Sequence, residues 1–301
     1  DAFLCNKNTK EDDIKNAILN GAYAVISDNK LDIIDNEIAW IAIDDTKKAL
    51  KRYLRYKNIQ DSLILYYTDD ISFNIANSIC LDKKVVFLNN NTFESYAKIM
   101  NTDNNTIFIC NDEKFANHIN PFYKTIQNSK KEAVKMIKHT LFYVDFILND
   151  FFYKDVKFSL LFLDKLNKIV NFFTQNDIEF SIQNLYIKRH FEPIFVDYNL
   201  KIKNFGETSK VLIVEKESDL LHKEIDYLKK YAKYAKILLV IPKNHKEVYN
   251  NIEEFRYSSY DDLKQLIKKE YNFYLFLDKS CSDVFDYLNL LDIKKEEKLF
   301  K

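Results

Sequence analysis

Short apolar runs alternate with amphipathic stretches along much of the chain, and this alternation predicts an α/β fold. The runs are rich in β-branched and aromatic residues, as buried strands are. Between them, apolar residues recur every three or four positions, as on one face of a helix. Such alternation is typical of parallel sheets covered by helices. The expected strands lie at 2–5, 23–27, 40–43, 63–67, 85–88, 107–110, 210–214, 237–241 and 273–278, and the expected helices at 14–21, 46–55, 70–80, 92–100, 164–173, 218–234, 245–252 and 260–271.

The centre of the chain, from about residue 129 to residue 198, has a less regular pattern. Ser129 and Glu132 have the spacing of a capping box, in which two side chains satisfy the first N–H groups of a helix. The apolar residues that follow at helical spacing predict one long helix: Val134, Ile137, Leu141, Val144 and Leu148. Further strands are expected at 156–163, 178–187 and 191–198.

The turn between the strand at 63–67 and the helix at 70–80 is where a nucleotide-binding α/β protein has its phosphate loop. Such a loop needs glycine, so that backbone N–H groups can approach the phosphate, and usually a lysine. This turn has neither, and instead carries Asp69 and Asp70, whose carboxylates would repel a phosphate. A second interpretation is that one of the two aspartates simply caps the helix.

Composition excludes several function classes. The 301 residues include 45 Lys and Arg and 45 Asp and Glu, a balance that argues against a dedicated nucleic-acid binder. Two glycines, Gly21 and Gly206, are too few for a glycine-rich nucleotide loop. No apolar run reaches membrane-spanning length. The four cysteines form no C-x-x-C pair and the five histidines have no metal-binding spacing, so we expect reduced thiols, a cytoplasmic protein and no metal.

Two charged stretches are expected at the surface, because charged side chains are rarely buried. Lys188, Arg189 and His190 predict a small basic turn. On the helix expected at 218–234, His222 has acidic neighbours, which we interpret as a solvated acidic face: Glu217, Asp219, Glu224 and Asp226.

The stretches AFLCNKNTKEDDIKNAILNGAYAVISD and IAWIAIDDTKKALKRYLR carry a recognisable pattern. A strand leads to a helix that closes on A-x-x-x-G-A-x-A-V, and a later strand ends in D-D-T-x-x-A-L; the matching positions are Asp1, Phe3, Ala17, Gly21, Ala22, Ala24, Val25, Asp44, Asp45, Thr46, Ala49 and Leu50. This pattern resembles the N-terminal domain of the Mur ligases, most of all the branch that adds D-alanyl-D-alanine in peptidoglycan synthesis. The stretch YSSYDDLKQLIKKEYNFYLFLDKS resembles the family's closing helix and strand, with Lys279 and Ser280 kept.

The resemblance implies a three-domain, ATP-dependent ligase, but the positions that carry this activity in the family differ here. The family's phosphate loop, G-x-x-G-K-T, corresponds to residues 68–72, and its magnesium-binding glutamate to Cys110 and Asn111. The D-G-H segment that approaches the uridine nucleotide is replaced by residues 9–11, and the Y-N-A-N-P loop that meets the dipeptide by residues 215–219. The family's serine–arginine pair would precede Asp1, so we expect an upstream segment.

We therefore predict a three-part, Mur-ligase-like α/β architecture. It has a small N-terminal domain at 1–57, a reduced parallel-sheet central domain without a phosphate loop at 58–205, and a Rossmann-like C-terminal domain at 206–301. Three asparagines after the strand at 85–88 resemble the family's asparagine-rich segment. The candidate cleft residues are Asp69, Asp70, Ser72, Asn89, Asn90, Asn91, Lys279 and Ser280.

The predicted function follows from which positions are kept and which are lost. We predict a catalytically inactive, degenerate and shortened bacterial relative of the Mur ligases, monomeric and without a cofactor. It would bind a peptidoglycan precursor or a protein of the cell-wall pathway. The alternative is an active enzyme, either a divergent ATP-dependent peptidoglycan ligase or one that reuses the same cleft for different chemistry.

Overall fold

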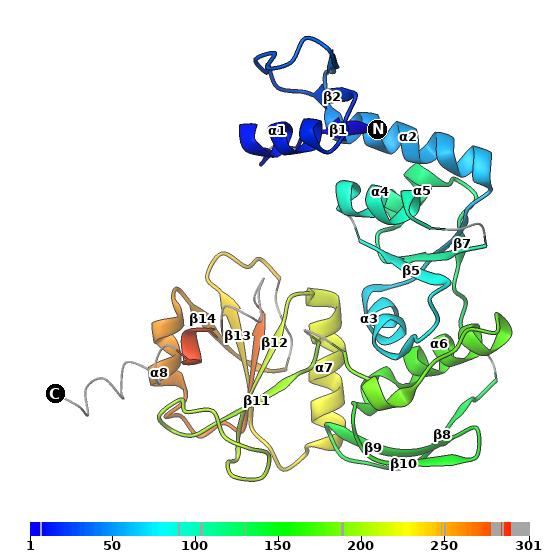
Figure 1. Ribbon diagram of the computed structural model, residues 1–301. Helices are drawn as coiled ribbons and strands as arrows, with labels where there is room; N and C mark the ends of the chain where they lie inside the picture. The colour runs from blue at the N-terminus through cyan, green and yellow to red at the C-terminus, as the bar shows by residue number, and fades with distance from the viewer. Residues whose placement is uncertain are drawn as a thin grey trace. The chain divides into compact units, whose positions relative to one another are not determined.

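Strands and helices alternate through most of the chain, as Figure 1 shows for the computed structural model. The structure describes residues 1–277, 284 and 286–289, except 7, 90, 103, 104, 130, 188, 189, 248 and 250. The chain forms two compact units: unit 1 consists of residues 1–73 and 81–127, and unit 2 of residues 74–80 and 128–301. Each unit contains a hydrophobic core of its own.

The N-terminal part of unit 1 is a three-stranded parallel sheet with the order β1-β2-β3. Its strands are β1 (Ala2–Leu4), β2 (Ala24–Ser27) and β3 (Ala39–Ala42), and α1 (Glu11–Leu19) connects the first two. Cys5, Ile14 and Val25 form its small core. Gly21 follows α1 with a φ of +91°, a left-handed conformation that glycine adopts without steric cost, and the chain turns there toward β2.

The second sheet of unit 1 has four parallel strands in the order β5-β6-β4-β7. These are β4 (Ile64–Tyr67), β5 (Val85–Leu88), β6 (Ile107–Cys110) and β7 (Lys124–Thr125). Helix α2 (Thr46–Asp61) leads into this sheet and contacts α4 (Thr92–Met100) and α5 (Glu113–Ile119) (Figure 1). Helix α3 (Asp70–Ile79) follows β4. Strands β4, β5 and β6 and helices α3 and α4 match the sequence prediction, because each of these strands is a short apolar run. Helix α5 and the exposed β7 were not predicted.

In unit 2 the long helix expected from residue 129 to residue 148 does not form. That segment is the hairpin of β8 (Val134–His139) and β9 (Tyr143–Leu148), joined to β10 (Phe151–Lys157) in an antiparallel sheet. Along β9, Val144, Phe146 and Leu148 are buried and their neighbours are more exposed, so the true apolar period is two. The turn at Thr140, whose N–H donates to the Tyr143 carbonyl, contains neither glycine nor proline. The prediction was therefore wrong because the helical spacing was coincidental.

The largest sheet of unit 2 has the strand order β11-β12-β15-β13-β14. β12 (Lys210–Glu215), β15 (Phe273–Leu277), β13 (Ile237–Pro242) and β14 (Glu253–Tyr257) are parallel, and β11 (Pro193–Val196) is antiparallel at one edge. The helices of this region include α6 (Leu163–Gln175), α7 (Ser218–Tyr231) and the short α8 (Leu263–Leu266).

Two predictions near the C-terminus need correction. Residues 245–247, within the helix expected at 245–252, are not helical, and β14 follows that segment. The helix expected at 260–271 is reduced to a 3₁₀ turn at Tyr260–Asp262 and α8. Within the described part of the chain, no helix combines the length and the apolar character needed to cross a bilayer.

Candidate functional site

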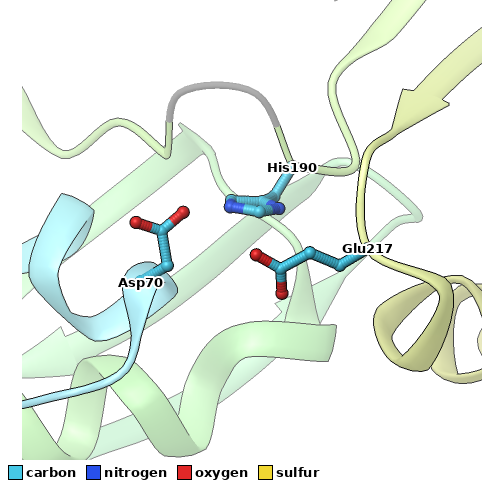
Figure 2. Close-up of side chains that lie close together, drawn as sticks. All are labelled: Asp70, His190 and Glu217. Atoms are coloured by element: carbon cyan, nitrogen blue, oxygen red, sulfur yellow. The ribbon is translucent and has the colours of Figure 1, made fainter. Parts of the chain in front are cut away.

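The turn between β4 and α3 positions the first two candidate residues. The Asp69 carboxylate accepts the backbone N–H of Ser72 at 3.0 Å and the Ser72 hydroxyl at 2.8 Å. Asp69 therefore caps α3, as the second interpretation of the sequence predicts. Ser72 is fully buried, so its hydroxyl is directed into the protein and bonds to this carboxylate. Asp70, at the start of α3, is labelled in Figure 2. Its side chain accepts a hydrogen bond from the amide of Asn111, which follows β6.

This arrangement does not fit a nucleotide phosphate. In a phosphate loop, the N–H groups at the start of the helix point at the phosphate oxygens. Here the N–H of Ser72 is bound to the Asp69 carboxylate, and the N–H of Thr68 donates to the carbonyl of Cys110 at 2.9 Å. A phosphate charge 4 Å from the carboxylate would be repelled by about 4 kcal/mol at an effective dielectric of 20.

Cys110 ends β6 and Asn111 follows it at the same edge of the sheet, and neither side chain is a carboxylate. Burial raises the pKa of the Cys110 thiol to about 12, so it is neither a nucleophile nor a ready metal ligand near neutral pH. Asp112 caps α5 through the N–H of Phe115 at 2.9 Å. A pocket of about 420 Å³ lies at this edge and is lined by Asn89, Asn111, Asp112, Glu113 and Lys114.

The asparagines after β5 have structural roles. Asn91 caps α4, because its side-chain oxygen accepts the N–H groups of Phe93 and Glu94. Asn89 donates from its amide to Glu94 at 2.7 Å and accepts the N–H of Asn91 at 2.9 Å. Asn90, Lys279 and Ser280 lie outside the described residues. Of the eight candidate residues, unit 1 therefore brings Asp69, Asp70 and Ser72 together in one turn and Asn89 and Asn91 in another.

A larger pocket in unit 1 was not predicted from the sequence. It has a volume of about 730 Å³ and is lined by Asn6, Asn8, Asp28, Asn29, Asp44, Asp45, Thr46, Lys47, Asn91 and Phe93. Most of these residues come within four positions after the end of β1, β2 or β3, so the pocket lies at the carboxyl edge of the first sheet. Ligands bind at this edge in open α/β sheets. The signal in the sequence was a pair of polar residues after each of the three strands.

Unit 2 contains a buried ionisable cluster that the sequence analysis also missed. His190 and Glu215 have fully buried side chains, and the Nδ1 of His190 lies 3.0 and 3.1 Å from the two carboxylate oxygens of Glu215. Glu215 ends β12 and also accepts the N–H groups of Lys216 at 2.8 Å and Glu217 at 3.0 Å. The prediction of a basic surface turn at 188–190 was therefore wrong for His190. Lys188 and Arg189 lie outside the described residues.

The third member of the cluster, Glu224, is a buried carboxyl on α7. Burial, followed by the charge of Glu215, raises its pKa well above the usual value. A backbone hydrogen bond from Phe191 favours the ionised form, but burial outweighs it, and the protonated carboxyl can donate a hydrogen bond to the neighbouring Glu215. The predicted solvated acidic face was thus wrong at this position. The sequence did contain a signal, because Glu224 shares the apolar face of α7 with Leu220, Leu221 and Leu228.

The surroundings of His190 leave little room for a substrate within unit 2. A cavity of about 40 Å³ borders the ring, a volume that suits one or two waters. A carboxylate oxygen of Glu217 lies within 4.8 Å of a His190 ring nitrogen, and Figure 2 shows this side chain directed toward the imidazole. Because these two groups offer possible metal ligands, the expectation of no metal stays a prediction.

Comparisons with known proteins give similarity at the level of structure. No family model matches the sequence, and no curated protein matches it. The alignment with the MurF ligase from Thermotoga maritima in complex with ADP covers 98% of this chain and 95% of the ligase chain, at 12% sequence identity and a TM-score of 0.56. MurF from Acinetobacter baumannii aligns with 98% of this chain and 90% of its own, at 10% identity and a TM-score of 0.55.

A further structure agrees with these two. The UDP-N-acetylmuramoylalanyl-D-glutamyl-2,6-diaminopimelate–D-alanyl-D-alanyl ligase from Acinetobacter baumannii aligns with 99% of this chain and 90% of its own, at 11% identity and a TM-score of 0.54. Identities this low are informative about the fold alone. The resemblance noted in the sequence is confirmed at that level: the chain has a Mur-ligase-like α/β fold.

Proposed function

We propose that this protein is a catalytically inactive member of the Mur-ligase-like fold that acts by binding a peptidoglycan precursor or a protein of the cell-wall pathway. One observation carries the proposal. The Asp69 carboxylate binds the N–H and the hydroxyl of Ser72, at the position where a ligase of this fold would bind the phosphates of ATP. An anion supplied by the chain itself thus takes the place of the nucleotide anion.

The end of β6 supports the same proposal independently. In the Mur ligases a glutamate at this position binds magnesium, which neutralises the charge of the transferred phosphate. Here Cys110 is a buried thiol whose pKa is raised to about 12, and the amide of Asn111 donates to Asp70. Neither residue supplies the negative oxygen that magnesium prefers. The phosphate cradle and the metal ligand are therefore replaced together.

The competing function, an enzyme with different chemistry, has less support. A reused active site should bring ionisable groups with perturbed pKa values to a cavity that a substrate can enter. Glu224 in unit 2, whose pKa is raised well above its usual value, is fully buried, and the cavity beside His190 measures about 40 Å³. The candidate residues Asp69, Asp70, Asn89 and Asn91 remain proposed ligand contacts at the sheet edge of unit 1, whereas Ser72 is fully buried and is withdrawn as a contact.

Calorimetric titration with magnesium and ATP tests the loss of ligase activity. We expect no saturable binding at millimolar ATP, for the wild type or for the control variant Asp226→Asn on the exposed face of α7. The variant Asp69→Gly releases the Ser72 N–H, and we expect it to bind inorganic phosphate more tightly than the wild type. Saturable binding of ATP to the wild type, at a dissociation constant below a millimolar, would overturn the proposal.

The binding function needs a separate measurement. Thermal unfolding with peptidoglycan precursors and with cell-wall fractions measures it, because a ligand that binds only the folded state raises the unfolding temperature. We expect at least one precursor or fraction to raise it in a concentration-dependent way. If no precursor, and no purified protein of the pathway, changes the unfolding temperature or co-elutes with the chain, the binding function is wrong.

A further inference from the structure

Helix α2 of unit 1 has two faces of different character. One face packs on the protein and carries the buried residues of the helix, which recur every four positions: Thr46, Leu50, Leu54 and Asn58. Five exposed residues lie together on the opposite side, which we call the outer face of α2: Lys48, Arg52, Arg55, Tyr56 and Ile59. Because successive helical residues are rotated by about 100°, these five fall within an arc of about 100°.

The charge of α2 is strongly positive. Its 16 residues contain one anion, Asp61, and six cations: Lys47, Lys48, Lys51, Arg52, Arg55 and Lys57. Within the part of the chain that the structure describes, Lys57 alone of these six forms an ion pair, with Asp61 at 2.7 Å. The whole chain has 45 basic and 45 acidic residues, so the positive surplus is local to this helix. Such a local surplus attracts anionic partners.

The pKa of His118 reports the same positive charge. His118 lies on α5, which contacts α2. Burial lowers the pKa of its imidazole, and the charges of Lys51 and Arg55 lower it further. The cations of α2 therefore act on a group in the neighbouring helix, as they would not if acidic neighbours neutralised them.

The outer face also carries two large side chains that the protein does not cover. Ile59 is 71% exposed and Tyr56 is 54% exposed. An anionic bilayer offers a contact for every residue of this face, because headgroup phosphates attract the cations and the layer below them takes up apolar side chains. Tyrosine is enriched at that level of a membrane. Duplex DNA offers phosphates without an apolar layer, so Ile59 favours a membrane as the partner.

We propose that the outer face of α2 docks on a membrane surface rich in anionic lipids. Lys48, Arg52 and Arg55 bind headgroup phosphates, and Tyr56 and Ile59 enter the boundary between headgroups and acyl chains. The helix stays packed on α4 and α5 through its buried face, so docking requires no unfolding. The attachment is peripheral and reversible, because no part of the helix spans the bilayer. Such docking adds to the proposed binding function without depending on it.

Cosedimentation of the full chain with vesicles tests this proposal. We expect binding to vesicles of equal parts phosphatidylcholine and phosphatidylglycerol, release from them by salt, and little binding to phosphatidylcholine alone. The double variant Arg52→Gln with Arg55→Gln should lower the partition coefficient about 25-fold, at about fivefold for each cation near an anionic surface. Glutamine is chosen because it preserves helix propensity. The matched control is Lys223→Gln with Lys230→Gln, which neutralises two exposed cations on α7 and should bind as the wild type does.

A variant of Ile59 separates a membrane from other polyanions. Ile59→Gln should weaken vesicle binding by about tenfold, because an apolar contact is lost, and should leave binding to duplex DNA unchanged. Circular dichroism checks that each variant is folded, and the lipid and salt comparisons need only the wild type.

Three outcomes would overturn the proposal. The first is that the wild type does not bind anionic vesicles. The second is that the two double variants lose binding equally, which would show that α2 is not the docking face. The third is that duplex DNA binds more tightly than vesicles at the same salt concentration, or that Ile59→Gln leaves vesicle binding unchanged, either of which would assign the face to another polyanion.

Discussion

Replacement of Glu224 by glutamine should change how the stability of the protein depends on pH. In the folded wild type the Glu224 carboxyl is buried beside Glu215, which raises its pKa well above the usual 4.5. In the unfolded chain the pKa returns to the usual value. The folded state therefore holds the proton more tightly, and the contribution of Glu224 to stability is complete below pH 4.5 and is lost as the pH rises toward the folded pKa.

The size of this effect follows from proton linkage. In the window between the unfolded and the folded pKa, each pH unit removes about 1.4 kcal/mol from the free energy of unfolding. Because a domain is stable by only about 5–15 kcal/mol, two such units remove a large share. Glu224→Gln has no proton to lose, and its amide can donate to Glu215 in place of the carboxyl. We therefore expect the variant to be less sensitive to pH above 4.5.

Urea denaturation followed by circular dichroism at several pH values between 4 and 8 measures this. The informative quantity is the difference in unfolding free energy between wild type and variant, because titrating groups far from Glu224 cancel and only the cluster with Glu215 and His190 contributes. The matched control, Asp226→Asn, changes an exposed acid on the same helix. A difference curve that stays flat from pH 4.5 to pH 8 would refute the assignment of a protonated Glu224.

Three further predictions concern unit 1. Asp69→Ala removes the cap of α3 and should lower the free energy of unfolding by about 1 kcal/mol in urea denaturation, whereas Asp12→Ala should not. Cys110 has a thiol pKa of about 12, so iodoacetamide at pH 8 should not label it in the native protein but should label it in urea. Peptide mass spectrometry measures the labelling. Rapid labelling of the native protein would contradict the burial of this thiol. Gly21→Ala should lower the free energy of unfolding by about 1–2 kcal/mol, measured by thermal unfolding, because the backbone at residue 21 is left-handed; an added Cβ would have space. Gly21→Asn should lower it by less, because asparagine tolerates this conformation better. Equal losses for the two variants would argue against a backbone cause.

Much of the fold of unit 1 could be predicted because its strands are short apolar runs and its helices have visible caps. The same pattern analysis failed at residues 129–148, where Val134, Val144 and Leu148 fit the helical period as well as the strand period. The two periods share several positions, and the turn at Thr140 contains no residue that signals a break. Tertiary pairing of β9 with β8 and β10 therefore decided the structure.

The site could be predicted only where its residues are neighbours in sequence. Asp69 and Ser72 are three residues apart, so the capping role of Asp69 could be anticipated. His190 and Glu215 are 25 residues apart, and their pairing depends on how β11 leads into β12. The large pocket of unit 1 joins strand ends that no local pattern connects. Its lining followed from the sheet order, which the sequence alone left open.

The bond between Asp69 and Ser72 has a consequence for any attempt to engineer phosphate binding into this turn. Under the proposed function, a carboxylate held three residues from the groups it occupies acts as a tethered competitor of a phosphate, and its effective concentration does not fall on dilution. Because this competitor stays attached, ATP could displace it only at a concentration high enough to outweigh its effective concentration. A single added lysine would also leave the competitor in place. A phosphate site engineered into this turn would therefore have to begin with the removal of Asp69.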